Sequence, residues 1–192
     1  MKLAPEDGPF SKSRLIEIVR YYYPAMEYAE SRASSGEELV RIEQSTPEWQ
    51  ARDKAHTRAM AHRGPWRELV KSLGDALPDY HVTDRTIWYL TEPAYLVELD
   101  PRDETRGGML VGMVSVIAPL YFICERVADR TLNDPISDRH QAATDALERA
   151  ILARYPYHRL AHDVGHTKVA GLRARGLQYG ETTLIDLLFS PY

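Results

Sequence analysis

Three regularly spaced histidines form the stretch of the sequence with the clearest potential for chemistry. His158, His162 and His166 are four residues apart within YHRLAHDVGH, and Asp163 directly follows the middle one. On a continuous helix, side chains at this spacing lie along one face, where imidazoles can bind zinc or iron. A proline precedes the set and a glycine interrupts it, and neither residue favours an unbroken helix. We therefore expect histidines on the surface or in a loop, with a metal site as the alternative.

The segment AHDVGH resembles the central motif of the HD-domain phosphohydrolases. In that family an adjacent His-Asp pair binds a divalent metal, and the metal activates water against a phosphoester. The resemblance implies His162 and Asp163 as the central ligands, with His140 upstream and Asp186 downstream. The family fold is all-helical, whereas the chain before the motif is rich in predicted strands. A metal-dependent phosphohydrolase is the alternative function; the main interpretation contains no catalytic residue, metal or other cofactor.

Other common catalytic motifs are absent from the sequence. It contains neither a phosphate-binding glycine motif nor a Gly-x-Ser-x-Gly elbow. Cys124 is the only cysteine, so no intrachain disulfide can form. Because Cys124 lies in the apolar run PLYFICE, we expect a buried structural thiol rather than a nucleophile. The N-terminus lacks the apolar core of a signal peptide, and no run reads as a membrane helix, so a cytoplasmic protein is expected.

The charge balance argues against a nucleic-acid partner. Acidic residues outnumber basic ones by 28 to 24, which gives a net charge of -4. Acids gather between residues 81 and 110 and include Glu98, Asp100, Asp103 and Glu104. These four side chains are either the solvated edge of a loop or a surface for a basic protein.

The aromatic content is dominated by tyrosine, with twelve tyrosines and three phenylalanines. Four of the tyrosines cluster near the N-terminus, and they cannot all be buried on one face of a helix. Tyr21 and Tyr22 are therefore candidates for a protein interface. The alternative is a tyrosine-rich rim of the core, with hydroxyl groups at the surface.

Helical patterns fill the first 80 residues. Ser35 and Glu38 have the form of a capping box, and Thr46 followed by Pro47 is a second start signal. Pro24 is expected to end or kink the first helix. The predicted helices cover 11–31, begin near 36, and cover 46–62 and 65–78.

Strand patterns dominate the middle of the chain. Short apolar runs at 85–90 and 94–99 predict a hairpin, and the run at 109–127 is long enough for two strands or one bent strand. Pro119 marks an edge, a bulge or a turn within that run. Residues 138–155 have one apolar stripe and predict a long amphipathic helix.

The order of these elements predicts an α+β fold in a single domain over 1–192. Helices occupy 1–80, and an antiparallel sheet of three or four strands with a long C-terminal helix occupies 81–192. The final apolar segment, 184–189, is expected to return to the core.

The second half of the chain resembles small bacterial immunity-type proteins, which neutralise secreted polymorphic toxins. The similar pieces are MVSVIAPLYFICE, the helix RHQAATDALERAILARY, YHRL and the closing GETTLIDLLFS, over roughly the last 85 residues. The resemblance implies a non-enzymatic, cytoplasmic binding protein of bacterial competition, whose partner is a cognate toxin. An acidic binder suits a basic nuclease toxin, and neither nucleic acid nor membrane is an expected partner.

Overall fold

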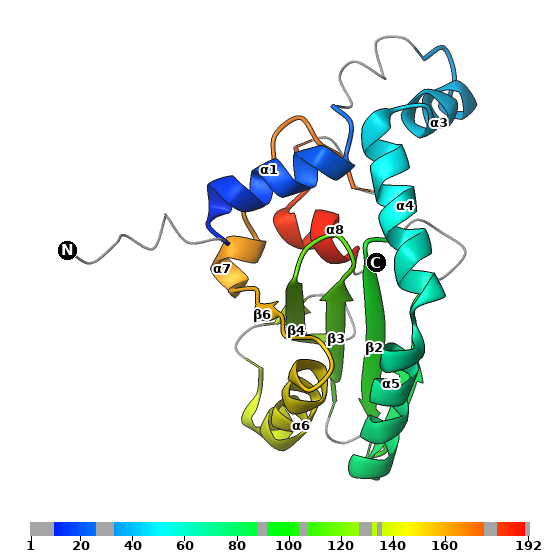
Figure 1. The fold of residues 1–192 in the computed structure, drawn as a ribbon. Helices are drawn as coiled ribbons and strands as arrows, with labels where there is room; N and C mark the ends of the chain where they lie inside the picture. Colours follow the sequence, from blue (N-terminus) through cyan, green and yellow to red (C-terminus); the bar gives the residue numbers. More distant parts are fainter. Residues whose placement is uncertain are drawn as a thin grey trace, which may run out of the picture.

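A mixed β-sheet forms the centre of the structure, and helices pack on both of its faces (Figure 1). The computed structural model describes residues 10–25, 33–87, 92–103, 107–126, 132–133, 136–174 and 180–190. The predicted α+β class is confirmed. None of the described helices combines the length and the apolar character needed to cross a bilayer.

The sheet is larger than the three or four strands predicted. Within the described residues its strands are β1 (Tyr80–Asp84), β2 (Ala94–Pro101), β3 (Met109–Ser115), β4 (Leu120–Arg126), β5 (Leu132–Asn133) and β6 (His158–Arg159). β1 to β5 are adjacent in chain order and antiparallel, while β6 pairs with β4 in parallel. The first four strands form an antiparallel sheet, in which β2, β3 and β4 lie in predicted strand segments, and two strands of two residues each extend it.

The helices come from both ends of the chain. The described helices are α1 (Lys12–Tyr22), α3 (Gly36–Gln44), α4 (Pro47–Ala61), α5 (Gly64–Ala76), the 3-10 turn η3 (Asp138–His140), α6 (Gln141–Leu152), α7 (His162–Gly165) and α8 (Leu184–Phe189). In Figure 1, α5 and α6 lie at the lower end of the sheet, and α1, α7 and α8 lie at its upper end.

The predicted start signals of two N-terminal helices are confirmed. The Ser35 hydroxyl accepts a hydrogen bond from the Glu38 backbone N–H, and the Thr46 hydroxyl accepts one from the Trp49 N–H, each at 3.2 Å. The first helix, α1, ends at Tyr22, two residues before Pro24, as expected from the proline; it is therefore shorter than the helical pattern at 11–31. Residues 26–32 lie outside the described residues.

The first strand of the predicted hairpin was placed wrongly. β1 occupies 80–84, whereas 85–87 have no regular structure and 88–90 lie outside the described residues. The partner strand β2 and the division of 109–127 into β3 and β4 are confirmed. Pro119 lies in the turn between β3 and β4.

The long C-terminal helix was also predicted wrongly. A 3-10 turn precedes α6, which covers only 141–152 instead of 138–155. The tail returns to the core as predicted, and it does so as the short buried helix α8, capped by Thr183 and Asp186.

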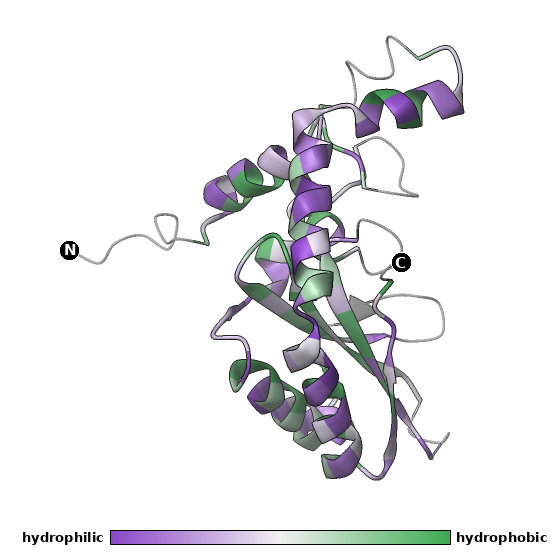
Figure 2. Cartoon of the chain, turned by 45° about the vertical axis from the view of Figure 1, so that its right-hand side comes forward, coloured by the Kyte–Doolittle hydropathy of each residue, from purple (hydrophilic) through white to green (hydrophobic). Residues whose placement is uncertain are grey.

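Two separate groups of apolar side chains bury the two faces of the sheet. We call the face packed by α5 and α6 the α6 face, and the face packed by α1 and α8 the α8 face. Along β2, Tyr95, Val97 and Leu99 point to the α6 face, and Ala94 and Leu96 point to the α8 face. This alternation is the two-residue period of a strand. Figure 2 shows the strands largely in the hydrophobic colour, as expected for a sheet covered on both faces.

Gly112 lets α6 lie close against β3. A Cβ atom at this position would be 2.9 Å from the Leu147 Cδ2 atom of α6 and 3.2 Å from the Val97 Cγ1 atom of β2. Leu147 is fully buried, so it has little room to move. By contrast, a Cβ atom at Gly74 on α5 would meet nothing within 4 Å.

The Gly112→Ala substitution is therefore expected to lower the free energy of unfolding by about 1–3 kcal/mol through overpacking. Gly74→Ala is the matched control and is expected to raise it by up to ~1 kcal/mol, because alanine favours the helix. Urea unfolding followed by circular dichroism measures both changes. Equal effects of the two substitutions would contradict the packing assigned to Gly112.

Candidate binding surface on the open end of the sheet

The α8 face is open toward the ends of β2 and β4. Glu98 and Asp100 follow Leu96 on this face of β2, and Asp100 is exposed. A cavity of about 530 Å³ lies here and extends to Phe189, at the end of α8. Its apolar walls include Leu96, Met109 and Phe189, and its polar walls include Arg85, Glu98 and Arg126. The volume falls in the range of ligand-binding pockets.

Glu98 is a buried carboxylate that lines this cavity. Only 8% of the residue is exposed, and two arginines bind its carboxylate from different elements. Arg85 Nε donates to Glu98 Oε2 at 2.8 Å, and Arg126 Nη2 donates to Glu98 Oε1. Arg126 Nη2 also lies 3.1 Å from the Met109 sulfur atom. The ion pairs connect β2 to β4 across the end of β3.

The two arginines differ in exposure. The Arg85 side chain is 61% exposed, whereas that of Arg126 is 23% exposed. Each guanidinium has five N–H donors, and the described bonds to Glu98 use one nitrogen of each. The cavity can therefore offer further donors to a carboxylate or carbonyl oxygen of a partner.

The four predicted partner-binding acids are not equivalent. Glu98 lies in β2 rather than in an exposed loop, and its carboxylate is already neutralised. Asp100 and Asp103 are exposed at the adjacent end of β2. Glu104 lies outside the described residues. The acidic surface that a basic partner could reach thus includes Asp100 and Asp103, but not Glu98.

The predicted tyrosine surface is only partly exposed. Tyr21 is 66% exposed and packs edge-on against Tyr22, which is half-buried. In Figure 1, α1 lies at the end of the sheet where β2 begins, whereas Asp100 is near the end of β2. Four other tyrosines are buried: Tyr23, Tyr80, Tyr95 and Tyr121. Among the described residues, most tyrosines therefore belong to the core and its rim.

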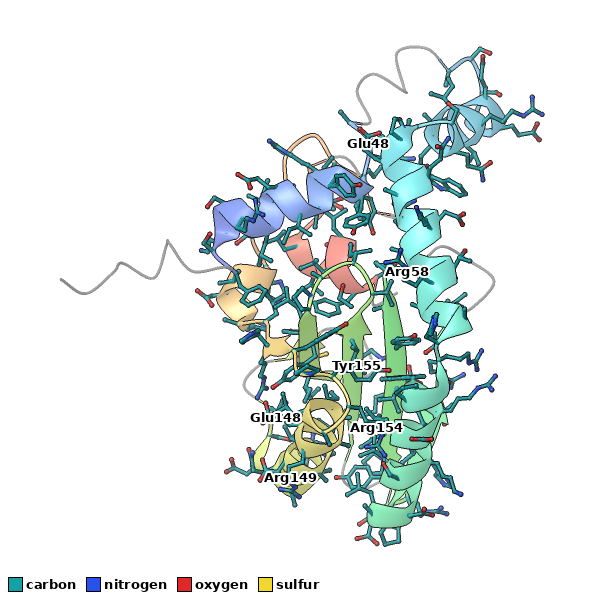
Figure 3. All side chains as sticks on the ribbon, in the orientation of Figure 1. Glu48, Arg58, Glu148, Arg149, Arg154 and Tyr155 are labelled. Carbon is teal, nitrogen blue, oxygen red and sulfur yellow. The ribbon has the colours of Figure 1, made fainter. Side chains whose placement is uncertain are left out.

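Tyrosine hydroxyls also connect the α6 face to its helices. The Tyr121 hydroxyl donates to Glu148 Oε1 on α6 at 2.5 Å, and the Tyr95 hydroxyl donates to the Ala59 carbonyl on α4 at 2.5 Å. Burial raises the pKa of Tyr95 to about 12. Figure 3 shows Glu148 and Tyr155 over this face of the sheet. These hydrogen bonds attach α4 and α6 to the sheet.

The four ligands implied by the phosphohydrolase resemblance do not converge. Asp163 is exposed and His162 lies on the same turn, but Asp186 caps α8 by accepting hydrogen bonds from Thr183. His140 is fully buried at a different place, where its Nδ1 is 3.0 Å from the Tyr80 hydroxyl. Within the described part of the chain, no three His, Cys, Asp or Glu side chains are grouped to hold a metal.

His140 lies beside a second buried carboxylate, that of Glu125, which pairs with Arg139. The His140 Nε2 atom is 3.4 Å from the Gly107 carbonyl oxygen and 3.7 Å from Glu125 Oε1. Burial by itself raises the pKa of Glu125, but hydrogen bonds from the Arg139 guanidinium and from Ser137 outweigh burial and lower this pKa to about 2. This network attaches the start of α6 to the end of β4.

No sequence pattern pointed to Arg85, Arg126, Met109 or Phe189 as residues of the candidate site. Met109 and Arg126 are direct partners in the register of β3 and β4, and Phe189 reaches the cavity only because the tail returns. The segments that carry these four residues contain no recognisable binding motif. Register and topology bring these side chains together.

Comparison with known proteins supplies no relative for this arrangement. No family model matches the chain, and neither a curated protein nor a solved structure matches it.

Glu98→Gln is expected to lower the free energy of unfolding by about 1–3 kcal/mol, because Arg126 then lies partly buried without its counter-charge. The control is Glu17→Gln on α1, whose ion pair with Arg14 is more than half exposed on both sides. Glu17→Gln is expected to lower the free energy of unfolding by less than ~0.5 kcal/mol. Urea unfolding at neutral pH measures both, and similar losses would contradict the role given to Glu98.

Glu125 is expected to make the protein sensitive to acid. Its folded pKa of about 2 lies below the ordinary value of 4.5, so its contribution to stability is fully present above pH 4.5. That contribution is lost as the pH falls from 4.5 toward 2. Glu125→Gln is therefore expected to be less stable at neutral pH and to lose less stability on acidification. If the free energy of unfolding of the parent and of Glu125→Gln changed with pH in the same way, the low pKa of Glu125 would not be the cause of the acid sensitivity.

Proposed function

We propose that the chain is a non-enzymatic binding protein of the immunity type, which neutralises a cognate bacterial toxin by direct contact. The open end of the α8 face is the proposed contact surface. The observation that supports this most directly is the cavity around Glu98, together with the exposed Asp100 beside it on β2. A cytoplasmic location is part of the proposal, since an immunity protein of this kind protects the producing cell.

Rigidity supports a role in binding. Leu96 and Glu98 lie on β2, which pairs with a strand on each side, so their backbone positions are fixed before a partner arrives. A preformed surface loses little conformational entropy on association. The ion pairs of Glu98 add to this rigidity because they hold the Arg85 and Arg126 side chains in one arrangement.

The mixture of groups also suits a protein partner. A partly buried apolar wall accepts an anchoring side chain, and charged groups around it fix the orientation of that side chain. The Arg85 guanidinium is largely exposed and can bind a carboxylate or carbonyl oxygen, and Asp100 and Asp103 are exposed acids at the end of β2. A basic nuclease toxin fits the two aspartates, because carboxylates that mimic phosphates speed association with such enzymes.

The test begins with the tagged protein in its native host. Affinity purification followed by mass spectrometry is expected to recover a stoichiometric partner that carries a toxin-like domain. Recovery of the protein alone under these conditions would argue against the immunity function.

Charge reversal then tests the surface against the recovered partner. The double substitution Asp100→Arg with Asp103→Arg is expected to weaken binding by at least about tenfold, mainly through slower association. The matched control reverses Glu68 and Asp75, two exposed acids on α5, which covers the opposite face of the sheet. Unchanged affinity in the first variant, measured by surface plasmon resonance, would exclude the open end of the sheet as the contact.

A further inference from the structure

His162 and His166 bring their ring nitrogens together at the surface. His162 begins the single turn of α7 and His166 follows its end, so the two residues are four positions apart on one turn. The two Nε2 atoms are 2.9 Å apart, and the ring centroids are 4.2 Å apart in an edge-on arrangement. His166 is exposed and His162 is half-buried, so solvent reaches the pair.

The surrounding structure holds this turn in place. The His166 backbone N–H donates to the His162 carbonyl at 3.0 Å, which closes the turn. The His162 ring stacks on Phe122 of β4, with centroids 6.2 Å apart. Gly165 packs so closely on α8 that a Cβ atom there would be 2.6 Å from the Ile185 Cγ1 atom. The glycine within the histidine motif therefore serves packing and fixes α7 against α8.

The distance between the two nitrogens matches one type of metal geometry. Two nitrogen ligands about 2.05 Å from an ion are ~2.9 Å apart when they subtend ~90°, as in square-planar or octahedral sites. In a tetrahedral site the same ligands are ~3.3 Å apart. The observed 2.9 Å, which is also a hydrogen-bond distance, fits the ~90° ligand angle of tetragonal Cu²⁺ or Ni²⁺ sites without movement of the two rings.

We propose that His162 and His166 form a two-histidine chelate for Cu²⁺ or Ni²⁺, with water in the remaining coordination positions. In this site the ion takes the place of the proton that the two Nε2 atoms share in the metal-free pair. The ligand set differs from that of the phosphohydrolase resemblance, since it uses His166 and neither His140 nor Asp186. It is also independent of the toxin-binding proposal, because His162 lies on α7 and His166 directly follows it, whereas the contact surface lies on β2 and β4.

The test uses the untagged full-length protein, because an affinity tag would itself bind these metals. Titration calorimetry with NiCl2 is expected to give one site per chain. His162→Ala and His166→Ala are each expected to weaken binding by at least about tenfold, since loss of even an outer-shell partner costs 10–100-fold. His158→Ala and His81→Ala, which remove two other exposed histidines, are the controls and are expected to bind as the parent does.

Electron paramagnetic resonance of the parent protein with one equivalent of CuSO4 supplies a measurement that needs no variant. Hyperfine structure from two imidazole nitrogens is expected, and a spectrum with one or none would overturn the proposal. Equal Ni²⁺ binding by the parent and by the double alanine variant would overturn it as well. Circular dichroism confirms that each variant is folded, and if an alanine variant unfolds, His166→Gln takes its place.

Discussion

Strand β3 is buried on both of its faces, and the rest of the fold follows from covering it. Only its first residue, Met109, is partly exposed. A strand of this kind needs an apolar layer above and below, and the chain supplies these layers from both of its ends. α5 and α6 cover one face, and α1 and α8 cover the other. The close approach of Leu147 to Gly112 shows how tightly one layer is fitted.

Charged groups appear where the two apolar layers end. Glu98 near the end of β2 and Glu125 near the end of β4 are both almost fully buried, and arginines neutralise both of them. A buried carboxylate is tolerated only when such partners satisfy it. The two networks differ in their surroundings. Glu125 is enclosed by the start of α6, whereas Glu98 lines an open cavity. That difference makes Glu98 part of a candidate contact surface and leaves Glu125 a structural group.

The candidate contact surface and the histidine pair occupy different elements, so they can act independently. The contact surface is built on strands, where the ladder fixes the side chains. The histidine pair is built on a single helical turn, which would be unstable alone and depends on the packing of Gly165 against α8. In both places apolar packing positions the polar groups: the α8-face core lies behind Glu98, and Gly165 packs against Ile185 next to the two histidines.

The sequence by itself determined the features that depend on neighbours along the chain. The start signals at Ser35 and Thr46 were readable because a helix cap forms between residues three positions apart. The apolar run at 109–127 indicated strand structure, and Pro119 was one of the places where it could turn. β1 was not predicted because it contains only two apolar residues, Tyr80 and Val82. The adjacent run at 85–90 contains more apolar residues and gave the stronger strand pattern. Tertiary structure alone decided that Glu98 meets Arg126, 28 residues away, and that α7 turns two histidines toward each other. Such contacts depend on strand register and on the return of the tail, which no local pattern of residues specifies.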